Sequence, residues 1–111
     1  MKITVIKKRV GEEPKVSVIE NSLEAIQKFV GGYYEVIGIE APNGKCYLHC
    51  NEDAIVENLP KNFAFVNIGG YIYGDIFFAQ ADNEGELISM SPENIDFLMS
   101  RFSQHGTVLK V

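Results

Sequence analysis

The side chains best suited to catalysis or metal binding are concentrated in one short segment that holds Cys46, His49 and Cys50. Thiolates and imidazoles are the usual ligands of zinc, and a structural zinc site needs four of them. The alternating pattern of this segment predicts a β-strand, in which successive side chains point to opposite faces. His49 would then face away from both thiols, and no second ligand pair follows. We therefore expect no metal and, because the two cysteine Cα atoms would be roughly 13 Å apart in a strand, no disulfide.

The remaining reactive groups form no motif. His105 lies near the C-terminal end, and neither histidine belongs to a nucleophile motif. The segment from Gly69 to Gly74 lacks the Lys-Ser or Lys-Thr that opens a phosphate-binding loop, so its glycines indicate backbone bends. We expect no catalytic residue and no cofactor. An enzyme that uses Asp75 or His49 as an acid-base group in an oligomeric pocket is the least favoured of three function classes.

The overall charge narrows the classes of partner. The 111 residues include 15 acidic and 10 basic ones, for a formal net charge of -5, which disfavours nonspecific binding to nucleic acid. The basic run Lys7-Lys8-Arg9 follows a predicted strand, and we interpret it as a solvated strand end without a partner. The first apolar run is too short for a signal peptide or a membrane span, so we expect a cytoplasmic protein without membrane contact.

Two β-hairpins are predicted to position these residues. Alternating apolar and polar residues indicate four strands, joined in pairs by turn residues. The strands are expected at residues 2–8, 15–19, 34–40 and 45–51. The second pair flanks Asn43-Gly44, which is typical of a hairpin turn. On its last strand one face is apolar and should meet the core, whereas the face with Tyr47, His49 and Asn51 is mixed, and we expect His49 on the outer side of the sheet.

Two helices are expected to cover the sheet. The first begins where Asn21 is followed three residues later by Glu24, which is the spacing of a capping box, and ends at Gly31-Gly32. The second begins at Ser91-Pro92, which combines a serine cap with proline at the first helical position. Helical periodicity places its apolar stripe toward the sheet and leaves Phe97 pointing away from it.

The fold class follows from these elements. Residues 63–68 and 71–81 are aromatic and β-branched and predict further strands, with a bend at Gly74-Asp75. Residues from about 103 to 111 are an edge strand or an ordered tail. We expect one α+β domain over residues 1–111, with a mixed, mainly antiparallel sheet of about five to six strands and two helices packed on it.

Aromatic residues near the ends and bends of the predicted strands are too numerous for a half-covered sheet to bury. We interpret most of them as core and the remainder as a surface that contacts a partner or stacks on a ligand. The candidate binding residues are Tyr33, Tyr34, Tyr47, Asn51, Asn62, Tyr71, Tyr73, Asp75 and Phe97.

Several segments together resemble a known family. They are residues 1–8, residues 23–27 with 30–36, Asn51-Glu52, Leu59-Pro60-Lys61-Asn62 and Gly74-Asp75. Over residues 1 to about 95 the chain is similar to the domain-of-unknown-function 3846 family. The resemblance implies a small protein encoded largely by phages, plasmids and their bacterial hosts, and it carries over no catalytic residue. The chain departs from the family in its aromatic stretch at 63–78 and after Phe102.

The mobile-element setting that the resemblance implies favours an accessory or anti-defence protein that binds a host protein stoichiometrically. In this hypothesis exposed aromatics ringed by acidic residues cover a surface of the target. In the alternative, tyrosines stack on a nucleotide signal or another small molecule while Asn51 and Asn62 read its edges. Only Arg9 and Arg101 are arginines, which weighs against a highly phosphorylated ligand. Unpaired sheet edges would also be compatible with a homodimer.

Overall fold

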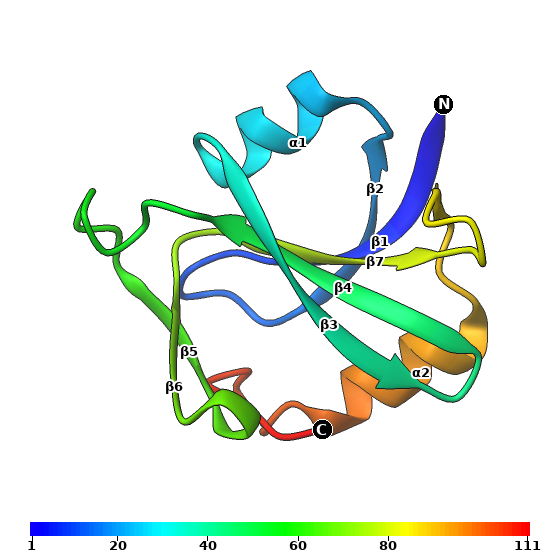
Figure 1. Cartoon of the computed structure of the whole chain (residues 1–111). Coiled ribbons are helices and arrows are strands. Elements are labelled where there is room, and N and C mark those ends of the chain that lie inside the picture. Colours follow the sequence, from blue (N-terminus) through cyan, green and yellow to red (C-terminus); the bar gives the residue numbers. More distant parts are fainter.

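Both predicted hairpins are present in the computed structural model, which describes all residues from 1 to 111 (Figure 1). β1 (Lys2–Lys8) pairs antiparallel with β2 (Lys15–Glu20). β3 (Tyr34–Ala41) pairs antiparallel with β4 (Gly44–Asn51). The alternation of the sequence therefore sets the register in each pair, because a shift by one residue would move every apolar side chain to the other face.

A later strand joins the two hairpins into one sheet. β7 (Ile76–Ala81) pairs antiparallel with β1 on one side and with β4 on the other, and the short β8 (Leu87–Ile88) pairs with β7. The six-stranded sheet has the order β2-β1-β7-β4-β3, so β2 and β3 are its edges. Two helices accompany this mainly antiparallel sheet, which confirms the expected α+β class.

α1 (Leu23–Val30) covers one face of the sheet (Figure 1). Its N-cap is Ser22, whose hydroxyl accepts the Ala25 N–H over 3.2 Å. The capping role expected of Asn21 is therefore wrong, and its side chain instead donates to the carbonyl of Leu87. Leu23, the first residue of the helix, is 60% exposed. The core beneath α1 consists of Ile3, Val5, Ile19, Ile26, Val30, Phe77 and Ala79.

α2 (Pro92–Arg101) packs against a second and larger core. As predicted, Ser91 caps the helix and proline occupies its start. Phe97 does not point away from the core as expected. It is half-buried and packs against that core, with the guanidinium of Arg101 4.6 Å from its ring centroid. Neither helix is long and apolar enough to cross a membrane.

The aromatic stretch expected to extend the main sheet instead forms a second sheet. β5 (Lys61–Phe65), a 3₁₀ helix η1 (Val66–Ile68) and β6 (Gly70–Tyr73) follow one another, and the tail adds β9 (Val108–Leu109). The strand order is β6-β5-β9, with β9 parallel to β5. The chain turns between the sheets at Gly74, whose φ of 78° is readily adopted by glycine. The expected single strand at 71–81 is therefore two strands in two sheets.

The small sheet and α2 share the larger core with the main sheet. Its members are Ile6, Ile39, Cys46, Leu48, Cys50, Phe63, Phe65, Ile72, Ile76, Phe78, Met90, Leu98 and Leu109. Cys46 and Cys50 face this core, as the alternation of β4 predicts. Leu109 is fully buried in it, so the tail residues after Phe102 are an integral part of the packing.

The mixed face of β4 is buried as well. His49 is only 2% exposed, and its ring stacks on Phe77 with a centroid distance of 4.5 Å and an interplanar angle of 11°. Tyr34 lies beside it, at 5.4 Å between ring centroids. The expectation that His49 lies on the outer side of the sheet is therefore wrong, because both faces of the central strands are covered.

Candidate functional site

The three side chains of the Cys46-His49-Cys50 segment are buried, and burial shifts the pKa of each. Burial raises the pKa of Cys46 to about 11, and burial together with the nearby Glu35 raises the pKa of Cys50 to about 12. Burial lowers the pKa of His49 to about 4. At neutral pH both thiols are protonated and the imidazole is neutral, so neither thiol is available as a thiolate nucleophile. No group of three or more His, Cys, Asp or Glu side chains is arranged to hold a metal ion.

Asn62, one of the predicted binding residues, is fully occupied within the fold. Its amide nitrogen donates to the carbonyls of Lys8 and Gly74 over 2.8 and 2.7 Å. Its amide oxygen accepts a hydrogen bond of 2.8 Å from the ammonium of Lys8. The side chain therefore links the two sheets and presents no free group to a ligand.

Asn51 has a similar linking role at the end of β4. Its amide nitrogen donates to the carbonyl of Val30 over 3.3 Å and to Glu57 over 3.2 Å. Its oxygen accepts the N–H of Asp53 over 2.7 Å. Asn51 thus ties the end of α1 to the loop at residues 52–58.

The other predicted binding residues lie in several environments. Tyr33 is exposed, whereas Tyr47 is half-buried, with the ammonium of Lys45 5.9 Å from its ring centroid. The carboxylate of Asp75 accepts the N–H of Val10 over 2.9 Å and pairs with Arg9 over 3.3 Å. Of the nine candidates, the structure brings Asn51, Tyr71 and Tyr73 together in the lining of one cleft.

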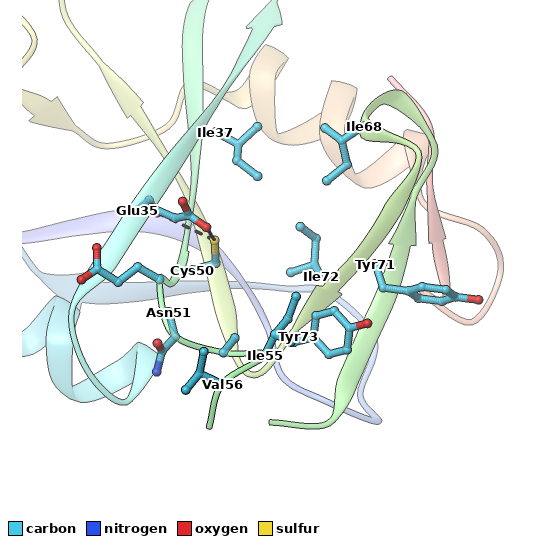
Figure 2. Close-up of a pocket in the computed structure, with 12 residues that line it drawn as sticks. Glu35, Ile37, Cys50, Asn51, Ile55, Val56, Ile68, Tyr71, Ile72 and Tyr73 are labelled. Atoms are coloured by element: carbon cyan, nitrogen blue, oxygen red, sulfur yellow. Dashed lines mark hydrogen bonds between the residues drawn. The ribbon is translucent and has the colours of Figure 1, made fainter. Parts of the chain in front are cut away.

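Figure 2 shows this cleft between the main sheet and the small sheet. Ile37 and Cys50 come from the β3–β4 hairpin, and Ile72 comes from β6. Ile68 of η1 and the loop at residues 52–58 complete the apolar lining. The cleft has a volume of about 180 Å³. We call it the acid-rimmed cleft because Glu35 and Glu52 also line it.

The loop at residues 52–58 exposes two aliphatic side chains beside the cleft. Ile55 is 71% exposed and Val56 is 82% exposed. Figure 2 places Ile55 near Tyr73 and Val56 near Asn51, while the ring of Tyr71 extends away from the centre of the cleft. Adjacent apolar side chains left exposed next to an apolar cleft are typical of an interaction surface.

The charges around the cleft are predominantly negative. Glu35 and Glu52 line it, and Asp53 and Glu57 belong to the same loop. None of these four carboxylates is in an ion pair, since the pairs in the structure involve other acids. The ammonium of Lys61 lies 4.2 Å from the ring centroid of Tyr71. The cleft therefore combines an apolar floor with acidic groups that have no cationic partner.

Sequence reasoning missed most of the residues that line the cleft. The pair Ile55-Val56 lies in an otherwise acidic loop, and this local contrast is a signal that could have singled it out. Ile37 and Ile68 carried no such signal, because they come from separate elements whose approach depends on the packing of the two sheets.

These features define a class of protein: an α+β domain in which an antiparallel sheet is covered by a helix on one face and by a helix and a small sheet on the other, with an open apolar cleft. The chain belongs to the family described as Domain of unknown function (DUF3846), whose sequence profile matches residues 1–103. The match includes α2 and extends past residue 95, where we expected it to end. No curated protein and no solved structure matches the chain.

Proposed function

We propose that this protein is a non-enzymatic binding protein and that the acid-rimmed cleft holds an apolar side chain of a partner protein. The observation that carries the proposal is the exposure of Ile55 and Val56 beside an apolar cleft. Anchor residues of protein interfaces are typically large side chains that fill such hollows, surrounded by contacts that exclude water. Ile55 and Val56 would supply part of that surrounding contact.

The size of the cleft favours a side chain over a nucleotide. Sites for small molecules and cofactors typically measure about 300–1,000 Å³, whereas this cleft measures about 180 Å³. The alternative, in which Asn51 and Asn62 read the edges of a nucleotide, is weakened further because both amides are engaged in hydrogen bonds within the fold.

The unpaired acids favour a partner segment with basic residues next to its apolar anchor. Glu35 and Glu52 would face these cations at the rim, where charge complementarity mainly raises the association rate and the specificity. Exposed pairs of this kind are screened by salt, so binding would weaken as ionic strength rises.

The mobile-element setting that the family resemblance implies makes a host protein the proposed partner. A protein that occupies a basic surface of a host defence component needs no active site, only an apolar anchor point and a negative rim. The role that we propose is therefore that of an accessory or anti-defence protein acting by stoichiometric binding.

The experiment that tests this proposal pans a library of linear peptides on the immobilised protein and compares variants. We expect the selected peptides to combine a large apolar residue with flanking Lys or Arg. Val56→Asp should reduce the affinity for these peptides at least about tenfold, since it places a charge at the apolar contact. Glu52→Lys should weaken binding mainly by slowing association.

Leu23→Asp is the matched control, because it introduces the same charge at another exposed aliphatic residue, on α1. Its binding should equal that of the unchanged protein. Equal loss in Val56→Asp and Leu23→Asp would reject the cleft as the binding surface. Peptides without an apolar anchor or without basic residues would reject the proposed chemistry.

A further inference from the structure

Four of the ten basic residues of this acidic protein line one groove. They are Lys2, Lys7, Arg9 and Lys28, and Phe29 lines the groove with them. The groove has a volume of about 530 Å³ and shares no residue with the acid-rimmed cleft. We call it the basic groove.

Lys2, Lys7 and Arg9 come from β1 and the residue that follows it, and Lys28 comes from α1. Lys7 shares a face of β1 with Val5, which packs beneath α1, so its side chain is directed toward that helix. Lys28 and Phe29 lie in the last turn of α1. The Lys7 ammonium lies 5.1 Å from the ring centroid of Phe29, and the Arg9 guanidinium lies 4.7 Å from it. One aromatic ring thus holds two cations close to each other.

The acids of the groove are already paired. Glu20 accepts a hydrogen bond of 2.6 Å from the amino group of Met1, and Asp75 pairs with Arg9 over 3.3 Å. Lys2, Lys7 and Lys28 take part in no ion pair. The groove therefore keeps a local excess of positive charge in a protein whose net charge is negative.

The cations also repel one another. The pKa of Lys7 is lowered, first by burial and then by the positive charges of Arg9 and Lys2. A bound anion would relieve this repulsion and stabilise the charged ammonium. Lysine is a common phosphate ligand that acts as a point charge, so the scarcity of arginine does not exclude phosphate here.

The space available fits a small ligand. About 530 Å³ falls within the usual range of about 300–1,000 Å³ for small-molecule sites. Through Phe29 and Asp75 the groove adjoins a second hollow of about 290 Å³, lined by Val30, Leu59 and Pro60 among others. A charged group could lie among the lysines while an uncharged part extends into this hollow.

We infer that the basic groove is a binding site for a small ligand that carries a diphosphate or triphosphate group, held by Lys7 and Lys28 beside Phe29. This site is additional to the protein-binding function proposed for the acid-rimmed cleft and does not depend on it. Two sources of the same chemistry are inorganic pyrophosphate and the diphosphate of a nucleotide such as ADP.

Calorimetric titration of the full chain with sodium pyrophosphate, and separately with ADP, tests this inference. We expect saturable binding of pyrophosphate that weakens with added sodium chloride. Lys7→Gln combined with Lys28→Gln should weaken binding at least about tenfold, because two of the three unpaired cations are removed. Tighter binding of ADP than of pyrophosphate would show that the nucleoside occupies the adjoining hollow, and equal binding would assign the site to the phosphates alone.

The matched control is Lys45→Gln combined with Lys110→Gln, which removes the same charge from two exposed lysines outside the groove. It should bind pyrophosphate like the unchanged protein. If the first double variant does not fold, Lys28→Gln alone, at an exposed position, replaces it. Absence of saturable binding for both probes, or equal weakening in the control, would overturn the inference.

Discussion

The ammonium of Lys8 donates to the amide oxygen of Asn62 across 2.8 Å. Lys8 is on β1 of the main sheet and Asn62 is on β5 of the small sheet, so this hydrogen bond joins the two sheets. Lys8 is 2% exposed, so the interpretation of Lys7-Lys8-Arg9 as a solvated strand end without a partner is wrong for Lys8. Its other acceptor is the carbonyl of Arg9 at 3.1 Å. No carboxylate lies within ion-pair distance of the Lys8 ammonium. Burial lowers the pKa of Lys8.

Substitution of Asn62 should therefore destabilise the fold strongly. Asn62→Ala removes an acceptor from a buried cation and leaves the carbonyls of Lys8 and Gly74 without their donor. We expect the free energy of unfolding, measured by urea denaturation, to fall by about 3 kcal/mol or more. Lys8→Met should cost less, because it also removes the buried charge. If Asn62→Ala were as stable as the unchanged protein, the hydrogen bonds of Asn62 would make no net contribution to the free energy of unfolding.

The buried His49 should make stability depend on pH in the weakly acidic range. Its pKa is about 4 in the folded state against an ordinary value of 6.5, so between these values the unfolded state binds a proton that the folded state does not. Stability is unaffected by this group above pH 6.5 and falls as the pH drops toward 4. The free energy of unfolding falls by up to about 1.4 kcal/mol per pH unit, and the total loss is about 3 kcal/mol.

Urea denaturation at constant ionic strength, from about pH 7.5 down to about pH 5, measures this dependence before most carboxylates titrate. His49→Gln should flatten the profile, although it also lowers stability at every pH because the stacking on Phe77 is lost. His105→Gln, at an exposed position, should leave the profile unchanged. A profile with the same slope in His49→Gln would assign the pH dependence to other groups.

Gly106 packs against the side chain of Lys8, so a methyl group at this position should destabilise the fold. A Cβ atom at Gly106 would lie 2.9 Å from Cδ of Pro14 and 3.1 Å from Cε of Lys8, and the backbone φ is +70°. Gly69 has a similar φ of +68° but open space around it. Gly69→Ala should therefore cost about 1–2 kcal/mol from backbone strain alone.

Gly106→Ala should cost a further ~1–3 kcal/mol, because the methyl group overpacks the contact with Pro14 and Lys8. Paired urea denaturation curves of the two variants measure the difference. Equal destabilisation would mean that the loop moves aside and that the enclosure of Lys8 is loose.

Local sequence signals were sufficient for the elements whose determinants lie within a few residues. Alternation and an Asn-Gly turn specified the hairpins, and Ser91-Pro92 specified the start of α2. They failed at the aromatic stretch, where β6 and β7 are adjacent in sequence but belong to different sheets. Gly74 signalled the bend between them, but no local pattern states which strand each segment will pair with.

The sequence by itself determined the fold class, both hairpins, the second helix and the family, because each depends on short-range patterns of side chains. Only the tertiary structure decided that His49 and Asn62 are buried, that Ile55 lies beside a cleft, and that Lys7 and Lys28 share a groove. Burial and charge clustering arise from contacts between segments far apart in the chain, which residue spacing does not encode.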